Sequence, residues 1–250
     1  MQIVVDKLLT RYDRSGKGKS IILLHGWADQ AGGLATLSSI LADRYEVITP
    51  DLPGFGGSEI PVGAWGLDDF AAFVEHLLQK LGVLDVYAYI GHSNGGAIAV
   101  RGLGSGQLKA DKLVLLSSAG IRDNDSKRAA VIKSVAKTGK LLAAPLPASI
   151  QSKLRRTLYR KAGSDMLTAE HMSPTFKRIV ADDVQAEAGR LKLPTLLVYG
   201  ENDQTTPPAF GRRFQQLIKN SSLKIIPSAG HYVHRDQPAA VIKVVEEFLA

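Results

Sequence analysis

Short apolar runs alternate along most of the chain with longer segments in which apolar residues recur every three or four positions. Residues 21–24 form an uninterrupted apolar run, which is typical of a strand buried on both faces. Residues 68–81 instead place apolar side chains at helical spacing and are followed by Gly82, a helix stop. The alternation predicts an α/β fold, with a mostly parallel sheet flanked by helices. Strands are expected at 3–5, 8–12, 21–24, 46–49, 87–90, 112–116, 195–199 and 223–226, and helices at 34–43, 68–81, 96–101 and 238–249.

The segment 121–190 breaks this rhythm, because it contains helix-like patterns and no strand-like run. Two of these patterns cover 127–142 and 148–160, and a third opens with Ser173 as N-cap and Pro174 as first helical residue. We interpret the segment as a helical lid inserted between two strands. A core made of 1–120 and 191–250 would then carry a lid at 121–190.

One tight turn carries the most specific chemical signal. Gly91, Ser93 and Gly95 match the G-x-S-x-G pattern, with an apolar strand before it and a helix after it. Bulky side chains two residues either side of the serine would collide in such a turn, so glycine stands there. The turn exposes the serine hydroxyl and aims the first N–H groups of the helix at what the serine attacks. The alternative is an ordinary turn with a surface serine.

A serine hydroxyl becomes a nucleophile only beside a base, and the base needs an orienting acid. Asp203 follows the predicted strand at 195–199, and His231 follows the one at 223–226. The carboxyl ends of parallel strands converge at one sheet edge, so both can reach Ser93. Glu201 is an alternative acid in the same loop. His25 and His92 flank the site and are expected to support it rather than act as the base.

Five sequence blocks together resemble the α/β-hydrolase fold superfamily, in its lid-bearing serine esterase-like branch. The resemblance covers nearly the whole chain, and the blocks occur in the order of that family. They are Leu-His-Gly-Trp at 24–27, Asp-Leu-Pro-Gly-Phe-Gly-Gly-Ser at 51–58, Gly-His-Ser-Asn-Gly-Gly at 91–96, Gly-Glu-Asn-Asp at 200–203 and Ala-Gly-His at 229–231.

The resemblance implies a carboxylesterase that needs no cofactor and no metal. Ser93 would be the nucleophile, His231 the base and Asp203 the orienting acid. The backbone N–H groups of Trp27 and Asn94 would form the oxyanion hole. Relatives often have methionine or leucine where this chain has Asn94, but the expected donor is the backbone. A serine nucleophile argues against the related dehalogenases and epoxide hydrolases, which use a carboxylate.

The substrate is expected to be a small acyl ester. Candidate substrate-binding residues flank the nucleophile or lie on apolar faces of the lid, although the lid residues could simply pack on the core. These candidates are His25, His92, Val131, Val135, Leu154, Leu158 and Phe176. The same triad would also serve thioester hydrolysis, acyl transfer or carbon–carbon bond hydrolysis, and a non-catalytic ligand receptor stays open.

The net charge of +7 is concentrated in one region. Residues 121–180 hold thirteen Lys or Arg against four acids, a net charge of +9, and the remainder is at −2. This region could be an ordinary solvated surface, or it could steer an anionic substrate or an acyl carrier protein. The blocks at 25–27 and 51–56 are similar to those of pimeloyl-carrier-protein methyl esterases. The expected docking patch is Arg155, Arg156, Arg160 and Lys161.

Other classes of protein are disfavoured. The chain of 250 residues has no cysteine, which excludes disulfides and thiolate chemistry. It shows no signal peptide and no run approaching the roughly 20 apolar residues of a membrane span. The histidines lack metal-ligand spacing, and the basic region lacks the interleaved aromatics that stack nucleic-acid bases. We expect a cytoplasmic monomer or homodimer.

Overall fold

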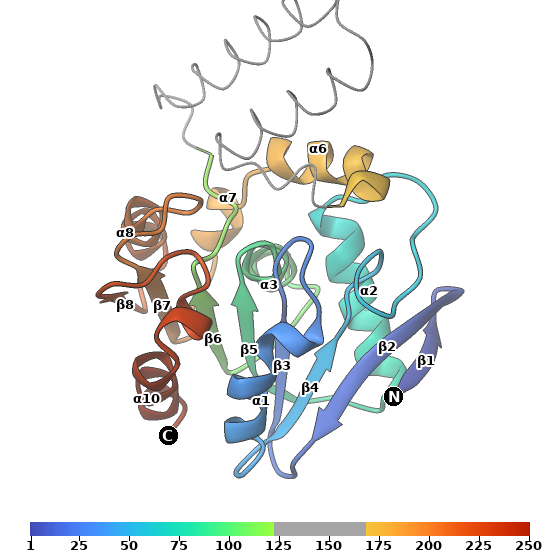
Figure 1. Ribbon diagram of the computed structural model, residues 1–250, viewed down its shortest axis with the longest axis horizontal. Helices are drawn as coiled ribbons and strands as arrows, with labels where there is room; N and C mark the ends of the chain where they lie inside the picture. The colour runs from blue at the N-terminus through green and yellow to red at the C-terminus, as the bar shows by residue number, and fades with distance from the viewer. Residues whose placement is uncertain (123–168) are drawn as a thin grey trace, which may run out of the picture.

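A computed structural model describes residues 1–122 and 169–250, and its centre is an eight-stranded sheet in the order β1-β2-β4-β3-β5-β6-β7-β8 (Figure 1). The pairings β1–β2 and β2–β4 are antiparallel, and all others are parallel. The predicted α/β fold is therefore confirmed. The strands are β1 (Gln2–Val5), β2 (Leu8–Ser15), β3 (Ser20–Leu24), β4 (Glu46–Pro50), β5 (Val86–His92), β6 (Lys112–Leu116), β7 (Thr195–Gly200) and β8 (Ser221–Ile226).

Helices cover both faces of the sheet and bury a separate core on each. In β3, Ile22 and Leu24 belong to one core, and Ile21 and Leu23 belong to the other. Successive side chains of a strand point to opposite faces, so a strand covered on both sides must be apolar throughout. One core includes α2 (Leu67–Lys80), α3 (Asn94–Ser105) and α8 (Pro208–Leu217); the other includes α1 (Ala35–Leu41) and α10 (Pro238–Leu249).

Several helices differ from the sequence prediction. A 3-10 turn, η1 (Ala31–Leu34), precedes α1. Ser173 is not an N-cap, because η3 (Glu170–Met172) runs directly into α6 (Ser173–Ala181) and Met172 takes the cap position. Helix α8 was not predicted, and neither were the short helices α7 (Gln185–Ala188) and α9 (Val233–Asp236).

The described end of the predicted lid is anchored to α3, the helix that follows Ser93. Arg101 of α3 forms ion pairs with Asp182 at 2.5 Å and Glu187 at 3.0 Å. Helix α6 lies across the end of the sheet at which the parallel strands terminate (Figure 1). The helices predicted at 127–142 and 148–160, the pocket candidates Val131, Val135, Leu154 and Leu158, and the patch Arg155, Arg156, Arg160 and Lys161 lie outside the described residues.

Across residues 1–122 and 169–250, every helix is too short or too polar to cross a membrane. Over the same ranges, no group of three or more His, Asp or Glu side chains is arranged to hold a metal ion.

Candidate active site

Ser93 stands at the junction of β5 and α3 in a conformation that non-glycine residues rarely adopt. Its φ is 50° and its ψ −115°, and α3 begins at the next residue. A Cβ on Gly91 would lie 2.5 Å from Gly96 Cα, and one on Gly95 would overlap the carbonyl of Leu24. These are backbone atoms and cannot move aside. The glycines are therefore required, as predicted, although Gly95 is constrained by β3 rather than by its own turn.

Ser93, His231 and Asp203 form a continuous line of hydrogen bonds. His231 Nε2 lies 3.0 Å from Ser93 Oγ, and His231 Nδ1 lies 2.9 Å from Asp203 Oδ2. A Cβ on Gly200, at the end of β7, would overlap the carbonyl of Gly230. The absence of that side chain lets the loops carrying Asp203 and His231 lie side by side. The structure thus brings together the three residues that the sequence order predicts.

The Asp203 carboxylate is fully buried and surrounded by donors. Its Oδ1 accepts hydrogen bonds from the N–H groups of Thr205 at 2.8 Å and Thr206 at 2.9 Å. Burial raises the pKa of Asp203, but the hydrogen bond and charge of His231 and the Thr206 donors outweigh it and leave the pKa lowered. The carboxylate is consequently ionised at neutral pH. Glu201 is exposed and accepts instead from the Ser228 N–H, so it does not face the histidine.

Thr206 is a member of the site that the sequence analysis missed. Its Oγ1 lies 2.8 Å from Asp203 Oδ2, 3.0 Å from His231 Nδ1 and 2.9 Å from the carbonyl of Ser117. The Thr206 hydroxyl therefore contacts both Asp203 and His231 and links them to the backbone of Ser117, directly after β6. The sequence does place Thr206 three residues after Asp203, but nothing in the local sequence distinguishes Thr206 from its neighbour Thr205.

The loop after β3 lies against Ser93. A Cβ on Gly26 would be 3.2 Å from Ser93 Cβ. Within the described part of the chain, the backbone N–H groups of Trp27 and Asn94 donate to no acceptor. Free N–H groups beside a nucleophile and at the start of a helix suit an oxyanion. The oxyanion-hole role of these two residues stays a prediction.

His25 supports this loop through its backbone contacts. Its Nε2 accepts from the Leu52 N–H at 2.9 Å, so its proton is on Nδ1 and is donated to the Gly26 carbonyl at 2.8 Å. Burial chiefly lowers the pKa of His25, which keeps the ring neutral. Both ring nitrogens are engaged and the side chain is fully buried. This favours the supporting role over substrate binding.

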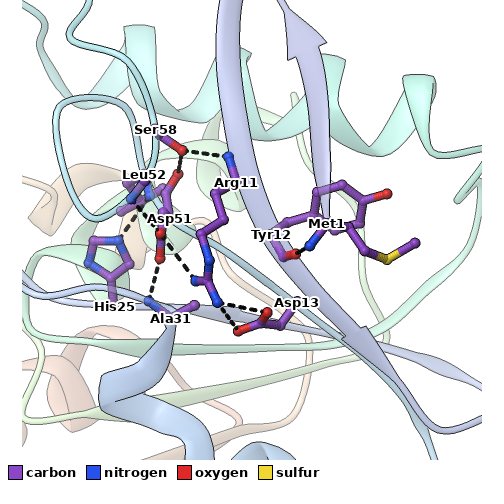
Figure 2. Close-up of polar contacts among 10 residues, drawn as sticks. Met1, Arg11, Tyr12, Asp13, His25, Ala31, Asp51, Leu52 and Ser58 are labelled. Carbon is purple, nitrogen blue, oxygen red and sulfur yellow. Dashed lines mark hydrogen bonds and ion pairs between the residues drawn. The ribbon is translucent and has the colours of Figure 1, made fainter.

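A buried carboxylate holds the next part of the loop (Figure 2). Asp51 Oδ1 accepts from the Ala31 N–H at 2.6 Å, and Oδ2 accepts from the Gly57 N–H at 2.8 Å and from Arg11 Nη1 at 3.2 Å. Ser58 Oγ donates to the Asp51 carbonyl at 2.7 Å. The block at 51–58 therefore wraps around its own aspartate and fixes the start of η1, a few residues after Trp27.

Aromatic side chains surround Trp27. Its ring lies 4.9 Å from Phe55 and 5.1 Å from Phe176, measured between ring centroids. Phe176 on α6 is partly buried against the core. Of the predicted substrate-binding residues on the lid, Phe176 is the one that the structure describes, and it lies beside Trp27. The role of Phe176 in binding substrate stays a prediction.

The rings of His92, His231 and His234 form a cluster next to Ser93. His92 Nε2 lies 3.0 Å from the carbonyl of His231 and donates to it, since a carbonyl only accepts. The His92 ring lies 5.0 Å from the His231 ring and 4.7 Å from the His234 ring. Burial is the main reason that the pKa of His92 falls well below its ordinary value and that the pKa of His234 is lowered to about 4. His92 and His234 are both buried.

These neutral histidines predict acid sensitivity of the fold. The unfolded chain has a histidine pKa near 6.5, so it binds more protons than the folded chain between about pH 6.5 and 4. The free energy of unfolding should therefore fall as the pH falls through this window, with about 3 kcal/mol from His234 alone once the pH is below 4. Urea unfolding at several pH values measures this.

His234→Gln separates the contribution of His234 from general acid effects. It should flatten the loss of stability, because it removes the buried ring whose pKa is lowered to about 4. An unfolding free energy that does not change between pH 6.5 and 4.5 in the unmodified protein would contradict the prediction.

Comparison with known proteins gives the family. A family model described as alpha/beta hydrolase fold matches residues 19–238. The chain belongs to the α/β-hydrolase fold family. It is 25% identical over 238 residues to a pimeloyl-[acyl-carrier protein] methyl ester esterase of Nitrosomonas europaea, covering 88% of this chain and 91% of the relative. It is 27% identical over 262 residues to a 2-hydroxy-6-oxo-6-(2'-aminophenyl)hexa-2,4-dienoic acid hydrolase of Metapseudomonas resinovorans, covering 96% and 87%.

Solved structures agree on the fold. The enol-lactonase of Burkholderia xenovorans LB400 superposes with a TM-score of 0.77 at 22% identity, covering 100% of this chain and 99% of the other. A thermophilic esterase of Thermogutta terrifontis superposes with a TM-score of 0.76 at 20% identity, covering 100% and 97%. This member of the α/β-hydrolase family is thus similar to hydrolases of esters and of related bonds.

Proposed function

We propose that this α/β-hydrolase is a serine carboxylesterase that works through an acyl-enzyme. The observation that carries the proposal is the line of hydrogen bonds from Ser93 through His231 to Asp203, at 3.0 and 2.9 Å. A base within hydrogen-bond reach of a hydroxyl, itself oriented by a buried carboxylate, is what nucleophilic catalysis by serine requires.

In the first half of the reaction, His231 Nε2 takes the proton of Ser93 as Oγ attacks the ester carbonyl. The ionised Asp203 holds the His231 proton on Nδ1 and stabilises the imidazolium that forms. The carbonyl oxygen becomes negative and is stabilised by the N–H groups of Trp27 and Asn94, each worth about 3 kcal/mol in comparable sites. His231 then gives its proton to the leaving alcohol.

In the second half, water attacks the acyl-enzyme while His231 acts again as base. The carboxylic acid leaves and Ser93 recovers its proton. The cycle uses only groups of this chain and water, so the proposal invokes no cofactor and no metal. We place a small acyl ester in the site, with its scissile carbonyl between Ser93 and the loop that carries Trp27.

A second candidate is hydrolysis of a related bond by the same groups. The relatives named for a pimeloyl-[acyl-carrier protein] methyl ester and for a 2-hydroxy-6-oxo-6-(2'-aminophenyl)hexa-2,4-dienoic acid favour testing both classes of substrate. The residues of the proposed carrier-protein docking patch lie outside the described structure, so the support comes from the similarity alone. Acyl transfer and thioester hydrolysis need the same triad, and the reaction assay must therefore include their substrates.

The test joins a chemical probe with a substrate series. A fluorophosphonate should label the protein at Ser93, mapped by peptide mass spectrometry, because only an activated serine reacts. Hydrolysis of p-nitrophenyl esters from acetate to palmitate should then show turnover, with the preferred chain length reporting the size of the site. Labelling without ester turnover would move the proposal to carrier-protein esters, thioesters or the dienoate class, whereas no labelling of folded protein would favour a ligand receptor.

A further inference from the structure

One arginine joins the two segments that would carry the proposed chemistry. Arg235 lies on α9, four residues after His231, and its Nη2 pairs with Asp29 Oδ2 at 2.5 Å. Its Nε donates to the Gly33 carbonyl at 3.1 Å, and its guanidinium lies 4.8 Å from the centre of the Tyr232 ring. We define this set of contacts as the Arg235 clamp. It links the segment that bears the base to the loop after β3.

The loop held by the clamp is strained. Ala28 has a φ of 56°, a left-handed conformation that residues with a side chain rarely adopt. It stands directly between Trp27 and Asp29. Such a conformation persists only where the surrounding structure fixes it. Asp51 fixes the loop farther along, at the Ala31 N–H, and the clamp fixes it next to the strained residue.

The same two segments also meet in the interior. His92 donates to the carbonyl of His231, and its Nδ1 would be 2.8 Å from a Cβ on Gly26. The buried His92 ring therefore contacts both the segment that bears His231 and the loop after β3, and Arg235 joins the same two segments at a second place. Two separate contacts between two segments restrict their relative motion more than either contact alone.

We propose that Arg235 is a positioning residue that holds the Trp27 loop in register with His231. The inference rests on the proposed function, in which the base and the oxyanion donors act in the same step. A donor stabilises the transition state only where it sits at hydrogen-bond distance from the developing charge, so a looser loop lowers the rate of acylation. Because the contacts of Arg235 are with Asp29, Gly33 and Tyr232 rather than with Ser93, Trp27 or Asn94, we expect its loss to change kcat more than KM.

Two matched pairs of variants test the Arg235 clamp, and Arg235→Lys adds a fifth variant. Arg235→Gln removes it, and Arg14→Gln is the control, because Arg14 makes a similar ion pair with Glu46 and a backbone contact with Leu81 far from the site. Gly33→Ala displaces it without changing any charge, since a Cβ at Gly33 would overlap the Arg235 guanidinium and the Asp29 carboxylate. Gly32→Ala is the control for that change, because the nearest atom to its Cβ would be 3.8 Å away.

The expected result is a fall in kcat of about tenfold in Arg235→Gln and Gly33→Ala, a fraction of the loss caused by deleting an oxyanion donor, with KM within about twofold. Hydrogen exchange should be faster at residues 26–33 in both variants. The two control variants should match the unmodified protein in both measurements. Arg235→Lys, which keeps the charge but not the planar fork, should lose activity as well.

Three outcomes would overturn the proposed role of Arg235. The first is an unchanged kcat in Arg235→Gln, and the second is an unchanged rate of hydrogen exchange at residues 26–33 in that variant. The third is a normal kcat in Arg235→Lys, which would assign the effect to the positive charge alone. Failure of the proposed carboxylesterase function would give a different result, because the unmodified protein would then neither turn over esters nor react with the fluorophosphonate. Hydrogen exchange reads the clamp independently of turnover, so the two failures are distinguishable.

Discussion

Ser93→Ala should reduce ester turnover by at least a thousandfold and leave the protein folded. The substitution removes the only atom that the proposed mechanism uses to form the acyl-enzyme, so the residual rate comes from binding and the oxyanion donors alone. Stability should change little, because the side chain loses one oxygen at a position whose backbone is fixed by Gly91, Gly95 and Gly96. Steady-state kinetics on the preferred p-nitrophenyl ester and urea unfolding measure the two effects.

The control for this variant is a serine of similar setting outside the triad. Ser117 is buried and also has a positive φ, of 45°, but it lies at the end of β6 and not at the elbow. Ser117→Ala should retain the fluorophosphonate reaction that Ser93→Ala loses. The assignment would be wrong if Ser93→Ala kept more than a tenth of the unmodified activity.

That the three residues of the proposed triad lie together could be predicted from sequence, because each of them follows the end of a parallel strand. Ser93, Asp203 and His231 come after β5, β7 and β8, and parallel strands of one sheet end at the same edge. The glycines on each side gave a local reason for the turn. The fold class followed from strand composition, since strands covered on both faces must be apolar throughout.

Contacts that join distant segments could not be predicted in the same way. Thr206 braces Asp203 and His231, but its sequence neighbour Thr205 is the same residue type. Arg235 meets Asp29 across 206 positions of the chain, and its sequence setting is that of an ordinary solvated arginine. The start of α6 was misplaced because η3 continues directly into it, which puts Ser173 inside the helix and Met172 at the N-cap position.

Asp203→Asn should lower kcat by about ten-thousandfold while KM changes little. The carboxylate accepts the His231 Nδ1 proton at 2.9 Å and so leaves Nε2 free to take the proton of Ser93. An amide NH2 facing Nδ1 would push the His231 proton to Nε2, which then cannot act as base. Thr205 and Thr206 can still donate to the remaining oxygen, so the loop should keep its shape.

Glu201→Gln is the matched control, because it makes the same change in the same loop at an exposed carboxylate that contacts Ser228. It should keep near-normal kcat. Nitrogen-15 NMR of the imidazole distinguishes the mechanism from simple misfolding, since the proton of His231 should move from Nδ1 to Nε2 only in Asp203→Asn. Loss of activity in Glu201→Gln with activity retained in Asp203→Asn would reverse the assignment of the acid. Because both residues follow β7 within three positions, this pair of variants decides which carboxylate the fold uses to orient its base.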